Sequence, residues 1–324
     1  MTRHIRTAVI PAGGRGTRMM PASNAIPKEL FPVGRKPAIQ WAINEALDAG
    51  IEQILVVSSS RKPSIAAYFF GDRQTDTVFS RANWRRRNIL PNSQVRIINQ
   101  PTARGLGDAV HIAHLALGSE PFALLLPDEI LLGGSRLLRV MLDDYERTGD
   151  SGVSHLQVDP SEIGSYGCAA VGPSAYGDER LRVSACIEKP DPSTAPSCFA
   201  LSGRYVLGSD VLDLIGEVKP DGRGEVQLTS ALNRAASTFG LAGFVVREED
   251  GRVDVGNWQG WQEANVRCFS KGVTICMPSA ARNLRNSRVK TIGEPAKTTL
   301  ATEGVPSPVQ SLRQDLNGNL GVAG

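Results

Sequence analysis

The sequence predicts an α/β fold in which a doubly wound, mostly parallel, Rossmann-like sheet carries helices on both faces. Short apolar runs alternate with stretches of helical period, and a glycine cluster follows the first of these runs. Strands that alternate with helices are typical of parallel sheets with right-handed crossovers. The 324 residues, 41% of them hydrophobic, are enough to bury a full core.

The elements follow in order along the first part of the chain. A strand is predicted over residues 7–12, a helix over 37–49, and three further buried strands over 53–58, 95–99 and 122–127. Gly50 closes the helix, as glycine commonly does after the last helical turn. Parallel strands present their carboxyl ends at one edge, so we expect a ligand site there.

Two segments depart from this pattern. Between residues 71 and 91 the chain is polar and carries Arg81, Arg85, Arg86 and Arg87 around Trp84, which predicts an exposed excursion. It is either a solvated helix face or an anion site. We expect one large domain over residues 1–270, with a first half over about 1–130 and a second half over about 131–270. Residues 271–324 form a partly flexible extension.

The composition is that of an ordinary soluble globular protein. The 36 basic and 33 acidic residues nearly balance at a net charge of +3, so no nucleic-acid partner is required and an anionic substrate fits equally well. The five cysteines form no CxxC pair, which is typical of reduced thiols. The absence of a long apolar run or a signal peptide predicts a cytoplasmic protein with no membrane partner.

A glycine loop follows the first strand directly and contains Gly13, Gly14, Gly16 and Thr17. Such loops let backbone amides approach a phosphate, although a glycine turn also occurs for packing reasons. Met19 stands where a dinucleotide fingerprint needs a third glycine, and no Gly-Lys-Ser/Thr sequence follows. The loop therefore predicts a phosphate site of neither of these two types.

The loop continues into Pro27, Lys28 and Glu29, and residues 12–37 together resemble the signature of sugar-1-phosphate nucleotidyltransferases. The Pro-Lys-Glu element is closer to the bacterial UTP:glucose-1-phosphate uridylyltransferase branch than to the thymidylyl branch. The resemblance implies that Arg18 grips the departing β- and γ-phosphates and that Lys28 neutralises charge on the α-phosphate. Phosphoryl transfer independently needs such cationic stabilisation.

The base site is predicted at the end of the strand over residues 95–99. Gln100 stands there, and Gly105 opens a second glycine loop. An amide can donate and accept at once. The resemblance implies that Gln100 and the Gly105 backbone bind the edge of uracil or thymine, whereas the residues alone also allow a purine or a helix-capping turn.

Two carboxylates are predicted to bind Mg²⁺. Asp128 follows the buried strand over residues 122–127, and Asp254, by the resemblance, ends a strand near the close of the catalytic domain. Mg²⁺ prefers oxygen ligands and commonly uses one or two carboxylates together with substrate phosphates. Glu129 is expected to point away or to support this site.

The resemblance implies that residues 1–270 are a catalytic domain with a nucleotide-binding half over about 1–130 and a sugar-binding half over about 131–270. It also implies a small β-rich sugar-binding portion of the fold. Glu188 would bind sugar hydroxyls and Lys189 the sugar phosphate, while Gly167 and Tyr205 would line the pocket. A carboxylate accepts from vicinal hydroxyls, and a lysine steadies the attacking phosphate. The alternative for Tyr205 is a place in the core.

The reaction expected is transfer of a nucleotide from UTP to glucose 1-phosphate with release of pyrophosphate, by a homo-oligomer, either dimer or tetramer. Three positions depart from the uridylyltransferase pattern, because Asn24, Arg35 and Asp108 stand where Lys, Asp and His are usual. Transfer from dTTP or GTP, another sugar, and a catalytically silent regulatory paralogue therefore stay open. No GxSxG elbow or third histidine ligand favours a hydrolase.

Overall fold

The computed structural model describes residues 3–71, 94–173 and 180–270. Within them a nine-stranded sheet has the order β5-β4-β1-β6-β11-β8-β12-β10-β9. Its first four strands are mutually parallel, as the sequence predicts: β5 (Gln94–Asn99), β4 (Gln53–Ser58), β1 (Thr7–Pro11) and β6 (Phe122–Leu125). The predicted strand bounds are confirmed to within two residues at each end.

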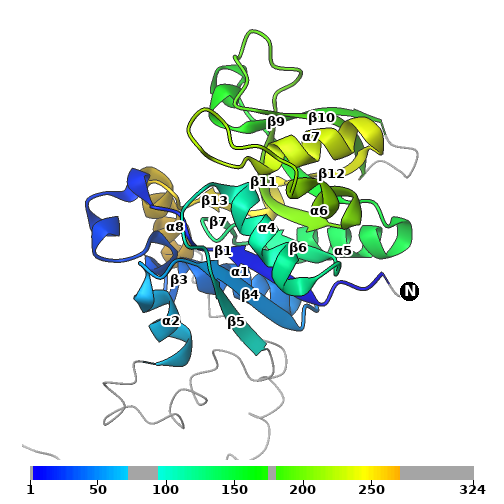
Figure 1. The fold of residues 1–324 in the computed structure, drawn as a ribbon. Coiled ribbons are helices and arrows are strands. Elements are labelled where there is room, and N and C mark those ends of the chain that lie inside the picture. Colours follow the sequence, from blue (N-terminus) through cyan, green and yellow to red (C-terminus); the bar gives the residue numbers. More distant parts are fainter. Residues whose placement is uncertain (1–2, 72–93, 174–179, 271–324) are drawn as a thin grey trace, which may run out of the picture. The chain divides into compact units, whose positions relative to one another are not determined.

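The prediction of a mostly parallel sheet is wrong for the other half. The remaining strands are β11 (Phe199–Leu207), β8 (Gly152–Gln157), β12 (Leu241–Val245), β10 (Leu181–Glu188) and β9 (Gly167–Pro173). Of their pairings only β8 with β12 is parallel. Strands β9 and β10 follow each other too closely for a crossover helix, so they pair antiparallel. The β-rich portion thus continues the main sheet (Figure 1).

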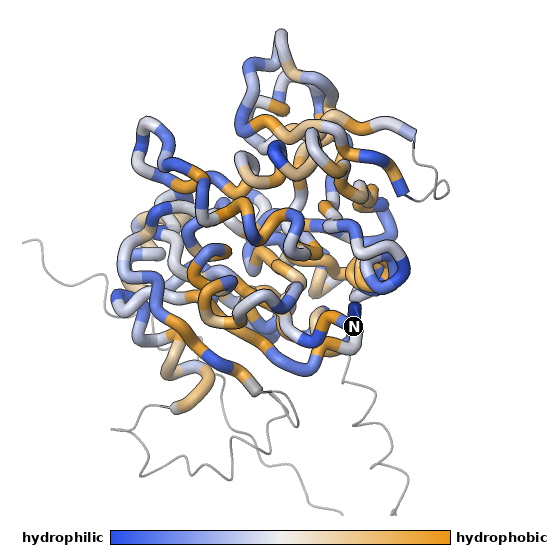
Figure 2. The backbone as a smooth tube through the Cα atoms, turned by 45° about the vertical axis from the view of Figure 1, so that its right-hand side comes forward, coloured by the Kyte–Doolittle hydropathy of each residue, from blue (hydrophilic) through white to orange (hydrophobic). Residues whose placement is uncertain are grey.

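Helices cover both faces of the sheet, which confirms the doubly wound arrangement. Alternate residues of β1 point to opposite faces, with Ile10 in one core cluster and Val9 in the other. The first cluster is covered by α1 (Ala38–Asp48), α2 (Pro63–Phe70) and α5 (Arg136–Thr148). The second is covered by α4 (Leu106–Leu117), α6 (Ser209–Ile215) and α7 (Leu228–Thr238). The apolar strands consequently lie inside, as the orange segments in Figure 2 show.

Two small ladders lie beside the main sheet. Strands β2 (Pro32–Val33) and β3 (Lys36–Pro37) form a hairpin, and β7 (Glu129–Leu131) pairs antiparallel with β13 (Arg252–Asp254). The pairing joins residues over a hundred positions apart and sets Asp254 opposite Glu129. Helix α8 (Trp258–Ser270) packs against β13 and β2. This ladder places the two predicted metal ligands close together.

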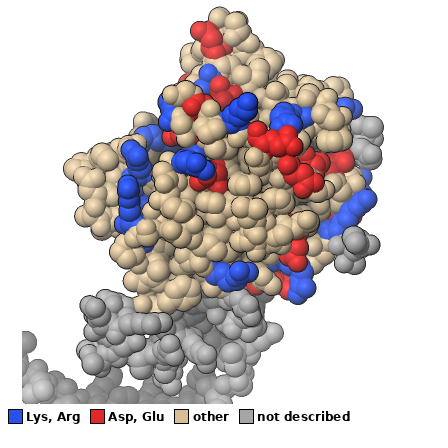
Figure 3. All heavy atoms as spheres, in the orientation of Figure 1, with Lys and Arg blue, Asp and Glu red and all other residues tan. Residues whose placement is uncertain are grey.

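The boundary between the nucleotide and sugar halves stays a prediction, since the sheet runs across it. The arginine cluster at 81–87 and the extension 271–324 lie outside the described residues. None of the helices in the described ranges has the length and hydropathy needed to span a bilayer. On the face drawn in Figure 3, basic and acidic side chains lie in small groups separated by uncharged surface.

His155 is a titratable group enclosed in the core. Its side chain on β8 is fully buried, stacks edge-on against Phe199 at 5.0 Å, and has no hydrogen-bond partner for either ring nitrogen. Burial lowers the pKa of His155 from 6.5 to about 4. The ring is therefore neutral in the folded chain at neutral pH.

Acid should destabilise the fold through His155. As the pH falls below 6.5, His155 of the unfolded chain binds a proton, whereas His155 of the folded chain stays neutral down to about pH 4. The free energy of unfolding therefore falls as the pH is lowered across the range from 6.5 to 4. The loss should reach about 3 kcal/mol at its acid end. Urea unfolding of the wild type and His155→Leu at pH 7 and pH 4.5 checks this. A variant with the same pH dependence as the wild type would contradict it.

Candidate active site

The loop that carries Lys28 is anchored by Lys62, whose side chain is 13% exposed. Lys62 donates to both carboxylate oxygens of Glu29, at 3.0 and 2.9 Å, and to the carbonyl of Ala12 at 3.0 Å. Glu29 is 2% exposed. Lys62 therefore joins the end of β1 to the short 3-10 helix Lys28–Leu30 and fixes where Lys28 begins.

Four charged side chains converge around Gly256. A Cβ added to this glycine would lie 2.9 Å from Arg18 Nη2, Asp128 Oδ2 and Asp254 Oδ1 alike. Lys28 Nζ forms a short ion pair with Asp128 Oδ2. Arg18 lies 4.0 Å from Asp128 and 3.8 Å from Asp254. The structure thus brings together the predicted phosphate cations and the predicted metal ligands.

The charge states follow from this proximity. Burial alone would lower the pKa of Lys28, but the charges of Asp128 and Glu29 outweigh it and raise the pKa above its usual value. Burial would likewise raise the pKa of Asp128, yet Lys28 holds it below its ordinary value. The pKa of Asp254 is raised, by burial first and also by the neighbouring charge of Asp128. A cation shared by both carboxylates would relieve this repulsion.

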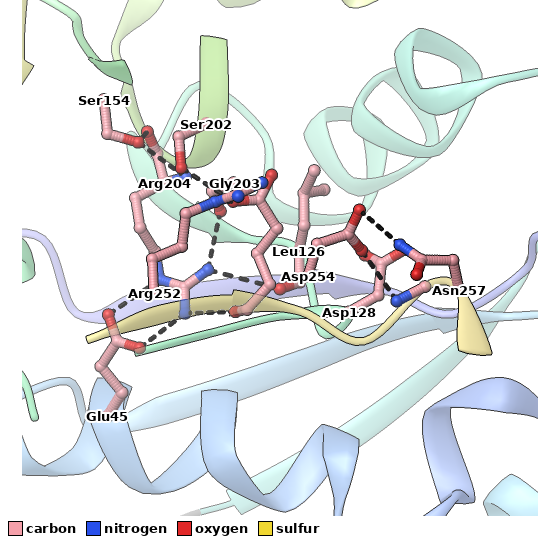
Figure 4. Close-up of polar contacts among 12 residues, drawn as sticks. Glu45, Leu126, Asp128, Ser154, Ser202, Gly203, Arg204, Arg252, Asp254 and Asn257 are labelled. Atoms are coloured by element: carbon pink, nitrogen blue, oxygen red, sulfur yellow. Dashed lines mark hydrogen bonds and ion pairs between the residues drawn. The ribbon is translucent and has the colours of Figure 1, made fainter. Parts of the chain in front are cut away.

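A buried arginine holds the segment that carries Asp128. Arg204 is 1% exposed and donates to both oxygens of Glu45, at 2.8 and 2.6 Å. It also donates to the carbonyls of Leu126, Gly203 and Glu129 (Figure 4). One guanidinium therefore fixes the backbone on both sides of Asp128 against helix α1 and strand β11.

A second set of bonds holds Asp254. The carboxylate of Glu129 accepts from Arg252 Nε at 2.6 Å and from Ser202 Oγ at 2.8 Å, so Glu129 supports the site. Asp254 accepts from the Gly256 backbone at 2.8 Å and from Asn257 at 3.3 Å (Figure 4). Both metal-ligand candidates are thus oriented before any ligand binds.

On the nucleotide side, the first glycine loop meets the predicted base site. A Cβ on Gly13 would lie 2.3 Å from Gln100 Oε1, so a larger residue there would displace the Gln100 amide. Gly16 has a φ of 68° and lies beside Lys28, whereas Gly14 and Thr17 are exposed. Gln100 is 3% exposed and donates to the carbonyl of Gly105 at 3.3 Å. Gln100 thus lies against Gly13 of the first glycine loop and Gly105 of the second.

On the sugar side, β9 and β10 place Gly167 directly opposite Glu188. Glu188 accepts from Thr229 Oγ1 at 2.6 Å and lies 3.6 Å from Lys189 Nζ. Lys189 has a φ of 44°, a left-handed conformation that is uncommon outside glycine and gathers at functional sites. This backbone conformation places the exposed Lys189 side chain beside the half-buried carboxylate of Glu188.

Tyr205, which was predicted either to line the sugar pocket or to lie in the core, is a core residue. Its side chain is 5% exposed and belongs to the second core cluster, and its neighbours across the sheet are Leu124 and Val153. The structure thus favours the core alternative, because a ring packed on both sides has little surface left for a sugar.

Comparison with known proteins decides the family. The family model described as "Nucleotidyl transferase" matches residues 7–270, the greater part of the chain. The chain belongs to the nucleotidyl transferase family. A UTP–glucose-1-phosphate uridylyltransferase of Staphylococcus epidermidis is 35% identical over 272 residues, covering 82% of this chain and 92% of that protein. The Pseudomonas aeruginosa protein of that name is 33% identical, covering 82% and 96%.

Solved structures of nucleotidyl transferases agree with the fold. A UDP-glucose pyrophosphorylase complexed with UDP-glucose gives a TM-score of 0.73 at 31% identity, covering 82% of this chain and 99% of that one. A UTP-bound UGPase from Acinetobacter baumannii gives 0.71 at 30% identity, covering 86% and 98%. The mixed sheet with helices on both faces is therefore the fold of this nucleotidyl transferase.

Several residues that build this nucleotidyl transferase site were not identified from the sequence. Lys62 and Glu45 carry no local signal, because each acts on a partner far along the chain. Arg204 stands in a segment expected to line the sugar pocket, but its guanidinium is buried behind Asp128 instead.

Proposed function

We propose that this chain transfers the uridylyl group of UTP to glucose 1-phosphate, giving UDP-glucose and pyrophosphate. The convergence of Arg18, Lys28, Asp128 and Asp254 around Gly256 carries the proposal. A triphosphate needs both cations and a carboxylate-held metal at one place, and these side chains supply them. The choice of UTP and glucose 1-phosphate as substrates rests on the names of the relatives.

Asp128 and Asp254 fit a Mg²⁺ ion. Members of the family generally use a divalent metal. No group of three acidic, histidine or cysteine side chains suited to a metal occurs among the residues that the structure describes. Two carboxylates suffice for Mg²⁺ when substrate phosphates and waters complete its coordination. The bound ion would neutralise phosphate charge, and chelation with EDTA should abolish turnover until excess Mg²⁺ is restored.

The chain's own residues do the remaining work in this proposal. Glu188 holds the sugar hydroxyls of glucose 1-phosphate and Lys189 holds its phosphate, so that a phosphate oxygen attacks the α-phosphorus in line. Lys28 neutralises the negative charge that develops on the α-phosphate. Arg18, whose side chain is 62% exposed, binds the β- and γ-phosphates as they leave as pyrophosphate. The P–O bond to pyrophosphate breaks as the new one forms, and no covalent enzyme intermediate is needed.

Glu188→Gln should raise the KM for glucose 1-phosphate by about tenfold while the KM for UTP stays unchanged. The amide keeps the size of the side chain but loses the charge that accepts from sugar hydroxyls, and it disturbs the bond from Thr229. Initial rates with each substrate varied in turn measure both constants. Equal rises for both substrates would show that Glu188 does not serve the sugar.

One assay separates the open alternatives. Pyrophosphate release is followed with UTP, dTTP or GTP, each with Mg²⁺ and a panel of sugar 1-phosphates. Preference for another pair would keep the reaction and change the substrates. Binding of nucleotide without turnover of any pair would favour a silent regulatory paralogue, the reading that Asn24 keeps open. We also propose a cytoplasmic homo-oligomer, dimer or tetramer, which light scattering on the purified chain would test.

A further inference from the structure

We propose that Asp108 fixes the amide of Gln100 in one orientation, so that the site selects bases with a ring N–H beside a carbonyl. Uracil, thymine and guanine present that edge, whereas cytosine and adenine present an unprotonated ring nitrogen beside an amino group. The proposal rests on the proposed function in taking Gln100 as the residue that meets the base. It adds the residue that decides which base is accepted.

The amide nitrogen of Gln100 is held by two acceptors. Gln100 Nε2 lies 2.8 Å from Asp108 Oδ2 and 3.3 Å from the Gly105 carbonyl oxygen. A carboxylate and a carbonyl can only accept, so the nitrogen must face them and the oxygen must face away. The backbone of Gln100 is fixed as well, since its N–H donates to Ser58 at 2.6 Å. Asp108 and Gly105 together leave one amide orientation.

Asp108 is itself held for this role. Arg104 donates to its Oδ1 from Nε at 3.2 Å and from Nη2 at 2.8 Å, which leaves Oδ2 for Gln100. The Asp108 side chain is 7% exposed, while Arg104 is 56% exposed and reaches it from the surface. The guanidinium therefore holds the carboxylate of Asp108 in position, with Oδ2 toward Gln100.

The freed oxygen faces the nucleotide side of the site. Gln100 Oε1 lies 2.3 Å from the position that a Cβ on Gly13 would take, against the first glycine loop. Among the described residues, Oε1 receives no hydrogen bond. Gly105 is the N-cap residue of α4, and the N–H of such a residue has no acceptor within its own helix. The site therefore offers one acceptor and one donor.

This pairing matches a ring N–H with a neighbouring carbonyl. The base N–H would donate to Gln100 Oε1, and the carbonyl would accept from the Gly105 backbone. A cytosine or adenine edge would place its unprotonated ring nitrogen against Gln100 Oε1, so two acceptors would meet. Its amino group would face the Gly105 N–H, so two donors would meet. Sites built to hydrogen-bond a given edge reject the opposite edge strongly, because their buried polar groups are left unpaired.

Asp108→Asn tests the proposal. Asparagine can offer its oxygen or its nitrogen to Gln100, so the Gln100 amide can rotate and meet either edge. We expect the wild type to bind UTP more tightly than CTP, and this ratio of dissociation constants to fall about tenfold or more in the variant. Titration calorimetry of both nucleotides on one protein preparation gives the ratio, which does not depend on the folded fraction.

Asp144→Asn is the matched control. Asp144 is a buried carboxylate on α5 that pairs with Arg180 at 3.0 Å, and it touches none of the proposed site residues. Its replacement should lower stability without changing the UTP-to-CTP ratio.

The outcomes separate this proposal from the proposed function. A wild type that binds CTP or ATP as tightly as UTP overturns the role of Asp108, and so does an unchanged ratio in Asp108→Asn. Neither result depends on turnover, because only binding is measured. Loss of the proposed function would instead be seen as absent pyrophosphate release by a wild type that still discriminates between UTP and CTP.

Discussion

Lys28→Ala should lower kcat by about a hundredfold or more, with the fold preserved. The Lys28 side chain is 17% exposed and forms an ion pair with Asp128. Arg18 also lies within ion-pair distance of Asp128. Stabilisation of a developing charge in a site with little water is worth far more than at the surface. Steady-state pyrophosphate release at saturating substrates measures the loss.

Two further variants sharpen this result. Lys219→Ala removes an exposed lysine and should leave kcat unchanged. Asp128→Ala should cause a loss comparable to that of Lys28→Ala. Thermal unfolding establishes that each protein is folded. Near-normal turnover by folded Lys28→Ala or Asp128→Ala would refute these assignments and the catalytic role of the site with them.

Arg204→Met should lower the free energy of unfolding by about 3–5 kcal/mol. The substitution leaves Glu45, with a side chain 4% exposed, without its ionic partner, and three backbone carbonyls lose a donor. Removing one member of a buried pair is costly because the other charge stays desolvated. Urea denaturation followed by circular dichroism measures the change.

Arg6→Met provides the matched control. Arg6 pairs with Glu52 by two bonds as well, but the two side chains are 61% and 50% exposed, so the loss should be much smaller than that of Arg204→Met. Equal losses in the two variants would mean that Arg204 contributes no more than a surface pair. Glu45→Gln added to Arg204→Met should recover part of the stability, since an amide is cheaper to bury than a carboxylate.

The part of the fold that could be predicted is the part where local signals agree. Residues 54–57 are apolar and mostly β-branched, and the predicted strand over residues 53–58 matches β4 at both ends. The alternation of helix and strand up to residue 127 is regular enough to give the parallel sheet. Beyond it, β11 lies between β6 and β8 in the sheet, and that insertion is decided by pairing across long stretches of chain that no local pattern records.

The candidate site divides in the same way. Asp128 could be named because a carboxylate after a buried strand is a local signal, and the resemblance supplied Lys28 and Asp254. Tyr205 illustrates the limit, since a tyrosine in a strand has the same sequence signature whether it faces a pocket or the core. Arg204 could not be assigned for a related reason: its role depends on carbonyls brought to it by folding.

The ladder of β7 and β13 separates the completion of the sheet from the completion of the site. A growing chain that has been synthesised through Val245 already contains all nine strands of the main sheet. Asp254 and the Gly256 turn come later, and they reach Asp128 only when β13 has added to β7. On the ribosome, therefore, the scaffold can assemble before the proposed triphosphate site is complete, because that site still needs β13 and the turn at Gly256.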